Sequence, residues 1–136
     1  MATRQRHHLR GRVREWLEQP NFAFLATLMV DGRPHVSPVW VDTEDDHVLV
    51  NTAEGRVKAS NVQHDERVAL SVSPLDDPYA HADIRGRVVD IVRGEEAEQH
   101  IHRLHQKYRG GGSYPLRPGE HRLKVVIEPV AVKVSG

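Results

Sequence analysis

The sequence predicts a mainly β protein with a few helices, built as a six-stranded antiparallel barrel. Three observations support this fold class. Six short segments carry the continuous apolar runs or the two-residue alternation that are typical of strands. Turn-forming residues separate most of these segments, which favours pairing between strands that are neighbours in the sequence. Helical spacing of apolar residues is confined to three segments, so we expect a curled sheet to enclose the core.

The chain begins with an expected helix over residues 4–18. Leu9, Val13 and Leu17 recur every four residues and form one apolar stripe. Pro20 ends this helix, because the residue before a proline avoids the α region. The remaining face is rich in arginine and comprises Arg4, Arg6, Arg10, Arg12 and Arg14. We interpret this cluster as a solvated helix face, with nucleic-acid binding as the alternative.

The six expected strands follow in order. Their bounds are residues 22–30, 35–41, 47–52, 67–72, 79–92 and 122–134. Asp31 and Gly32 predict a two-residue hairpin turn between the first two strands, because Gly tolerates positive φ. Gly86 predicts a bulge or bend in the fifth strand, and Pro129 an interruption of the last one.

Two further helices are expected, over residues 56–63 and 95–107. The second begins with acidic residues and ends with basic ones, which complements the helix dipole. The loop over residues 109–120 contains Gly110, Gly111 and Gly112. It is interpreted as a connection between helix and strand, and a lid over a substrate is the alternative.

Composition narrows the classes of protein further. The chain has 136 residues, which predicts a single domain over 1–136 with an N-terminal helical region over 1–19. It contains no cysteine, which excludes a disulfide scaffold, a cysteine-ligated metal and a thiol nucleophile. Nineteen basic and nineteen acidic residues balance, so a nucleic-acid partner is not expected. No apolar run has the length of a membrane span and no signal peptide is recognised, so a cytoplasmic location is expected.

Histidines on the helix over 95–107 raise the question of a metal site. His102 and His105 are three residues apart and share one helix face. Zinc sites need three or four protein ligands, and the sequence contains no HExxH motif. We therefore interpret this pair as part of a solvated helix face and expect no metal.

The first candidate site is an anion-binding turn after the third strand. That strand ends in Asn51 and Thr52, which carry hydrogen-bonding side chains. Gly55 then allows close backbone approach, and Arg56 and Lys58 open the helix over 56–63, which also contains Asn61. Arginine and lysine at a helix start are suited to phosphate. The alternative is a solvated basic turn.

The second candidate site lies on the second strand, at Ser37, Pro38 and Val39. A proline inside a strand marks an edge or a bulge and leaves neighbouring backbone groups unpaired. Those groups would bind the polar edge of a flat heterocycle, with Val39 or Trp40 supplying apolar surface. The alternative is an ordinary edge strand.

Taken together, four segments resemble the FMN-binding split-barrel superfamily that includes pyridoxamine 5′-phosphate oxidase. They are FAFLATLMVDGRPHVSPVW, NTAEGRVKASNV, DERVALSV and ADIRGRVVDI. The branch most similar to this chain comprises the actinobacterial oxidoreductases that use the deazaflavin F420. The resemblance implies a homodimeric split β-barrel with two cofactor sites at the subunit interface.

The resemblance also implies roles for individual residues. Arg56 and Lys58 would hold the cofactor phosphate. Asn51 and Thr52 would border the ribityl chain, and the backbone of residues 37–39 would lie along the ring. An aromatic residue of the partner subunit often flanks the ring in this superfamily. Tyr79 is the candidate here, ahead of Trp40 and Tyr114.

The implied activity is hydride transfer between F420 and an unsaturated organic small molecule. No dedicated catalytic residue is expected, because the cofactor carries the reactive atom. The arginine-rich N-terminal helix would supply cations for the longer anionic tail of F420. FMN is the alternative cofactor. A non-catalytic protein that binds F420 or a tetrapyrrole, with His35 or His81 near the ligand, is the further alternative.

Overall fold

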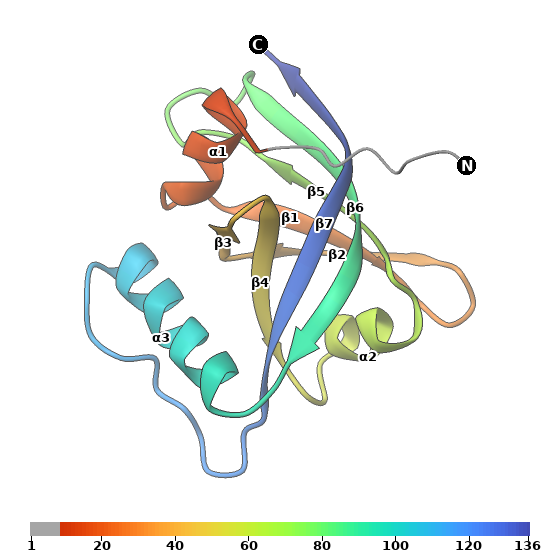
Figure 1. Cartoon of the computed structure of the whole chain (residues 1–136), viewed down its shortest axis with the longest axis vertical. Helices are drawn as coiled ribbons and strands as arrows, with labels where there is room; N and C mark the ends of the chain where they lie inside the picture. The colour runs from red at the N-terminus through yellow and green to blue at the C-terminus, as the bar shows by residue number, and fades with distance from the viewer. Residues whose placement is uncertain (1–8) are drawn as a thin grey trace.

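The computed structural model describes residues 9–136, which form one curled antiparallel sheet with three helices (Figure 1). The strands run in the spatial order β2-β1-β5-β6-β7-β4-β3. Their bounds are β1 Ala23–Leu28, β2 Pro34–Val39, β3 Val41–Glu44, β4 His47–Ala53, β5 Arg67–Val72, β6 His81–Val92 and β7 Arg122–Ser135. The helices are α1 Gly11–Glu18, α2 Val57–His64 and α3 Glu95–Arg109. The mainly β split-barrel prediction is confirmed.

The prediction of six strands is wrong, because the expected strand over 35–41 divides at Trp40. Its first part, β2, pairs with β1, and its second part, β3, pairs with β4. These two strands are the opposite edges of the sheet, and Trp40 alone separates them. The chain therefore crosses between the two edges within one residue, and this crossing curls the seven strands into a barrel.

Two local predictions about the sheet are confirmed. The hairpin between β1 and β2 forms where Asp31 and Gly32 predict it, and Gly32 has the expected positive φ of 86°. Its loop spans residues 30–32 rather than the two expected residues, because the Met29 N–H donates to the Arg33 carbonyl and the Gly32 N–H donates to the Met29 carbonyl. The register between β6 and β7 shifts at Gly86, where a side chain would meet Ile127. Pro129 was expected to interrupt β7, but the strand is continuous through it. The bulge at Gly86 lies opposite Pro129 and accommodates a residue that has no backbone N–H to donate.

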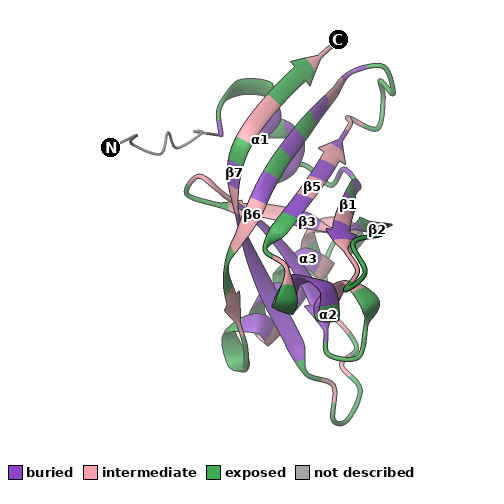
Figure 2. Ribbon diagram, turned by 90° about the vertical axis from the view of Figure 1, so that its right-hand side faces the viewer, coloured by how far each residue is buried: buried purple, intermediate pink, exposed green. Residues whose placement is uncertain are grey.

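The core lies inside the curled sheet, and buried positions alternate with less buried ones along β1, β5 and the first half of β6 (Figure 2). It is built mainly from aliphatic residues of the central strands: Leu25, Val41, Val48, Val50, Leu70, Ile84, Leu123, Val125 and Ile127. Helix α1 closes the upper end of the barrel with Val13, Trp16 and Leu17, whereas α2 and α3 lie at the lower end (Figure 1). None of the helices among the described residues is long and apolar enough to cross a membrane.

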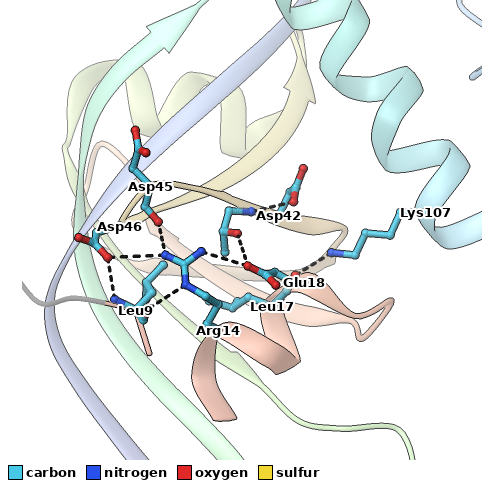
Figure 3. A network of polar contacts seen from close by, with 9 residues as sticks. Leu9, Arg14, Leu17, Glu18, Asp42, Asp45, Asp46 and Lys107 are labelled. Carbon is cyan, nitrogen blue, oxygen red and sulfur yellow. Dashed lines mark hydrogen bonds and ion pairs between the residues drawn. The ribbon is translucent and has the colours of Figure 1, made fainter. Parts of the chain in front are cut away.

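Helix α1 is held by a polar network around Arg14 (Figure 3). The Arg14 guanidinium donates to the Leu9 and Asp45 carbonyls, and it pairs with Glu18 and Asp46. The Leu9 N–H donates to the Asp46 carboxylate at 3.1 Å. The helix begins at Gly11, inside the expected range of 4–18, because the Leu9 N–H is bonded to Asp46 and the Arg10 backbone is extended. The earlier part of that expected helix lies outside the described residues.

Helix α3 ends as its sequence predicts. Gly110 follows it in the left-handed conformation, with its N–H bonded to the Gln106 carbonyl at 3.0 Å. The buried face of α3, which includes Ile101 and Leu104, packs toward β4 and β7. This packing creates the lower wall of the site described next.

Candidate functional site

A cavity of about 240 Å³ lies where the barrel is split, between β2, β4, α2 and α3. Its lining residues come from both candidate segments and from parts of the chain far from either. They are Phe22, Pro38, Val39, Trp40, Asn51, Arg56, Lys58, Ile101, Leu104, Tyr114 and Arg122. The cavity is therefore cationic where α2 and β7 begin, and most of its remaining lining is apolar or aromatic.

Lys58 joins the two predicted segments directly. Its Nζ donates to the Ser37 Oγ at 3.1 Å, which connects the first turn of α2 to edge strand β2. Burial lowers the Lys58 pKa, and the positive charges of Arg56 and Arg122 lower it further. No carboxylate among the described residues pairs with this ammonium. An anion in the cavity would remove that repulsion.

Arg56 is exposed and borders two hollows. Its side chain makes no hydrogen bond or ion pair with another residue of the described chain, although its backbone N–H donates to the Ala53 carbonyl. On one side it lines the cavity beside Lys58. On the other it lines an open groove of about 880 Å³ between α2 and the β1–β2 turn. This placement leaves its guanidinium available to a ligand that reaches either hollow.

Asn51 is buried and fixes the third cation of the cavity. Its Oδ1 accepts from Arg122 Nε at 2.8 Å, and its Nδ2 donates to the Ala97 carbonyl and to His100 Nδ1, both at 3.0 Å. Arginine has only donors, so the Asn51 atom facing Arg122 must be the oxygen. The His100 Nδ1 must therefore accept. Burial, together with surrounding cations, lowers the His100 pKa to about 3, which keeps the ring neutral.

Aromatic rings form part of the cavity wall, and one of them packs against a cation. Trp40 stacks on Tyr108 with centroids 5.2 Å apart and an angle of 7° between the rings. Tyr114 lies against the Arg122 guanidinium, 5.0 Å from its ring centroid. This wall can cover one face of a flat ligand, as expected for apolar contact with a heterocycle.

The interpretation of His102 and His105 as part of a solvated helix face is wrong, because both side chains are partly buried against this wall. His102 Nδ1 accepts from the Tyr114 backbone N–H at 3.0 Å. The His105 ring contacts the edges of both Trp40 and Tyr114. The histidines thus anchor the loop that follows Gly112 to helix α3, a role the sequence pattern did not indicate.

The remaining predicted site residues lie elsewhere. Thr52 is buried, and its Oγ1 has no hydrogen-bond partner in the described structure. Asn61 is buried with its amide donating to Thr27 Oγ1 at 2.9 Å, and it lines the open groove. Tyr79 is 87% exposed on the loop between β5 and β6, away from the cavity of its own chain. Its expected contact is with a partner subunit, and that role stays a prediction.

The expectation that the N-terminal helix supplies cations to the phosphate end is wrong within one chain. Helix α1 lies at the opposite end of the barrel from α2 (Figures 1 and 2). Arg14 is engaged with Glu18 and Asp46, and Arg12 donates to the Gly136 carbonyl. Arg4 and Arg6 lie outside the described residues. Arg12 and Arg14 instead stabilise the docking of α1.

Sequence reasoning missed Arg122, which supplies the third cation. It starts β7 and pairs across the sheet with Ala53, next to the turn that leads to Arg56. One signal could have found it. Arg122 and Lys124 are two residues apart at the start of a strand that continues with three apolar residues, so they share one face. Two cations on the same face of such a strand indicate a polar partner or a ligand.

Comparisons with known proteins agree with this architecture. The profile of the pyridoxamine 5′-phosphate oxidase family matches residues 9–133. No curated protein matches the chain significantly. A solved structure described as an F420 reductase superposes with a TM-score of 0.80 at 28% identity, covering 91% of this chain and 98% of that one.

Two more distant structures share the fold. A conserved hypothetical protein from Mycobacterium tuberculosis has a TM-score of 0.74 at 19% identity, over 98% of this chain and 89% of that one. General stress protein 26 from Bacillus anthracis has a TM-score of 0.65 at 15% identity, over 89% and 88%. The family profile spans nearly the whole described chain, and the curled barrel recurs in these structures. The chain therefore belongs to the pyridoxamine 5′-phosphate oxidase family of FMN-binding split barrels.

Proposed function

We propose that this protein is an F420-dependent oxidoreductase that acts as a homodimer. It would transfer a hydride between F420 and an unsaturated organic small molecule. One observation carries this proposal. Arg56 and Lys58 face the cavity beside residues 37–39, and neither is paired with a carboxylate among the described residues.

The residues present fit a phosphorylated, flat cofactor. Lys58 is half-buried without a carboxylate partner among the described residues, and this burial disfavours its charged form unless an anion binds there. Arg56 is exposed and adds a second cation at the same cavity. Lys58 and Arg56 would hold the phosphate, and the backbone beside Pro38 would meet the polar edge of the ring. Trp40 and Tyr114 would exclude water from one side. When bound, F420 would exchange a hydride with one carbon of a conjugated double bond, and a proton would be exchanged at the neighbouring atom.

Two observations favour F420 over FMN. The structure described as an F420 reductase is 28% identical to this chain, and the superposition covers 98% of that structure. In addition, Arg56 borders the open groove of about 880 Å³, which offers room for a tail longer than that of FMN. FMN would use the same phosphate anchor.

The homodimer is supported by an apolar outer face on β1 and β2. Phe24 is 55% exposed and Val36 is 63% exposed, and both lie on the outer side of the sheet. Exposed apolar groups in one area of a small protein mark a contact surface. Sedimentation should give a dimer, and Phe24→Asp should shift it toward monomer. A monomeric wild-type protein would contradict this part of the proposal.

The cofactor assignment is tested by titration. The purified protein is titrated with F420 and, separately, with FMN, and quenching of cofactor fluorescence is followed. We expect saturable binding of F420 and weaker binding of FMN. Tight binding of FMN without binding of F420 would replace the proposed cofactor, and binding of neither would overturn the proposal.

Turnover is tested separately from binding. Reduced F420 is mixed with the protein and a panel of enones, quinones and tetrapyrroles, and its oxidation is followed by absorbance. Oxidation that depends on both protein and acceptor supports an enzyme. Binding of F420 without turnover on any acceptor supports the alternative of a binding protein.

A further inference from the structure

Arg122 is a buried arginine with part of its hydrogen-bonding capacity unused. The residue is 4% exposed and lines the cavity. Its Nε donates to Asn51 at 2.8 Å, and its Nη1 pairs with Glu120 at 3.0 Å. Its Nη2 makes no hydrogen bond with another described residue. This nitrogen is accessible at the cavity, so it can donate to an acceptor that binds there.

The guanidinium is held in place from behind. Asn51 presents its Oδ1 to Arg122 because its Nδ2 is committed to the Ala97 carbonyl and to His100 Nδ1. The neutral His100 ring can accept that bond only while its Nδ1 carries no proton. Tyr114 covers one face of the guanidinium. These contacts restrain Arg122 before any ligand arrives, which lowers the entropic cost of binding.

Charge at the cavity specifies the ligand further. Arg56, Lys58 and Arg122 are three cations, and the positive charge of Arg122 contributes to lowering the Lys58 pKa. Glu120, paired with Arg122, is the carboxylate that offsets them. Two positive charges remain uncompensated among the described groups around the cavity. A doubly charged anionic group would neutralise them.

We propose that Arg122 is a third anion-binding residue of this cavity, positioned by Asn51 and His100, and that the group it helps to bind is a dianion. The proposal deepens the function proposed above and rests on the same cavity. A phosphate monoester meets this requirement by itself. A phosphodiester with a neighbouring carboxylate meets it with two groups. FMN has the first chemistry and F420 the second.

Small aromatic anions test the charge requirement without either cofactor. Phenyl phosphate is a dianion at mildly alkaline pH, and phenyl sulfate is a monoanion of similar shape. Calorimetry should show that the wild-type protein prefers phenyl phosphate by about tenfold, the usual effect of one charge-assisted contact. Equal affinity for the two probes would overturn the proposal.

Variants at Arg122 assign that preference to the residue. Arg122→Met should lower phenyl phosphate affinity about tenfold or more and abolish the preference over phenyl sulfate. Arg122→Lys keeps a charge and serves if the first variant does not fold. It should retain part of the affinity. Arg87→Met is the matched control, because Arg87 is a partly buried strand arginine paired with Glu66 and Glu128. Unchanged affinity in both Arg122 variants would remove the residue from the site.

Glu120 provides a test with the opposite sign. Glu120→Gln removes the negative charge that competes for the Arg122 guanidinium. Phenyl phosphate affinity should therefore rise by about threefold, in line with the loss of one partly exposed ion pair. A merely structural role for the pair predicts a loss of affinity instead. A decrease or no change would contradict the proposal.

His100 is tested through the Arg122 side chain itself. His100→Leu removes the acceptor for Asn51, whereas His100→Asn offers an oxygen close to the Nδ1 position. We expect faster hydrogen exchange at the Arg122 Nε–H in the leucine variant and near-normal exchange in the asparagine variant. Backbone amides of β4 and β7 should stay protected in both. Unaltered Nε–H exchange in His100→Leu would overturn the positioning role.

Failure of this inference is distinguishable from failure of the proposed function. If the phenyl phosphate preference holds but neither F420 nor FMN binds, the proposed function fails and the dianion site stands. If F420 binds while Arg122→Met leaves its affinity unchanged, the proposed function stands and the role of Arg122 fails. The affinities of Arg122→Met for F420 and for FMN can also be compared. They show whether this arginine contributes more to binding the phosphodiester and carboxylate of F420 or the phosphate monoester of FMN.

Discussion

Lys58 Nζ lies 3.1 Å from Ser37 Oγ, so the first turn of α2 is hydrogen-bonded to edge strand β2. These residues are twenty-one positions apart, and each belongs to a different candidate segment of the sequence. The contact places an ammonium next to the strand expected to carry the cofactor ring. The residues proposed to hold the cofactor phosphate and those proposed to meet its ring therefore border the same cavity.

Removing either cation of the α2 turn should weaken cofactor binding. Lys58→Ala and Arg56→Ala should each raise the Kd for F420 about tenfold or more, because each deletes a charge-assisted contact to the phosphate. Fluorescence titration measures the effect. Arg33→Ala is the control, since Arg33 is an exposed arginine paired with Asp31 on the neighbouring hairpin. Unchanged affinity in both Lys58→Ala and Arg56→Ala would refute the assignment.

Lys107 should make stability depend on pH. Its Nζ donates to the Leu17 and Val41 carbonyls at 2.6 Å, and burial lowers its pKa from 10.5 to about 8. Between these values the unfolded chain holds a proton that the folded chain has released, so stability rises with pH. After allowance for solvent screening, the gain from pH 8 to pH 10 should be about 1–2 kcal/mol relative to Lys107→Met.

Urea unfolding of the two proteins across this range checks the Lys107 prediction. The comparison stops at pH 10 because Tyr108 acts in the opposite direction above it. Burial raises the Tyr108 pKa from 10 to about 12, so the folded chain keeps a proton that the unfolded chain has lost, and stability then falls. Parallel pH profiles for wild type and Lys107→Met would contradict the prediction.

Gly86→Ala should destabilise the protein, although alanine in place of glycine within a strand normally stabilises it. A Cβ at this position would lie 2.7 Å from Ile127 Cγ2 and 2.8 Å from the Glu128 carbonyl oxygen. Such overpacking costs about 1–3 kcal/mol. Thermal and urea unfolding measure the change. An increase in stability would show that β7 moves aside more readily than the bulge suggests.

The Asn61 amide should stabilise the docking of α2 on β1. It is buried and donates to Thr27 Oγ1 at 2.9 Å. Asn61→Ala should lower the free energy of unfolding by about 1–3 kcal/mol, because it leaves a buried hydroxyl without its partner. Combining it with Thr27→Val in a double-mutant cycle should reveal coupling of about 1 kcal/mol. Gln63→Ala, at an exposed amide on the same helix, is the control and should change stability little.

Local chemistry along the sequence was enough to predict most elements of the fold. Asp31-Gly32 predicted the first hairpin, and Gly86 predicted the register shift between β6 and β7. The acidic start and basic end of the segment beginning at Glu95 predicted helix α3 and its direction relative to the helix dipole. The basic turn at Arg56 and Lys58 was also found from sequence. Each of these features depends on residues that are neighbours along the chain, so their effect can be read without knowing what lies across the sheet.

The tertiary structure decided which distant residues share the cavity. Trp40 divides one expected strand between the two edges of the sheet, because each half finds its own pairing partner. Arg122 reaches the turn before Arg56 only through pairing of β4 with β7. His100 is connected to Arg122 through Asn51, which is hydrogen-bonded to both, and this connection exists only because α3 packs over Asn51. Pairing and packing between residues dozens of positions apart leave no local pattern, which is why the basic turn was predictable and its third cation was not.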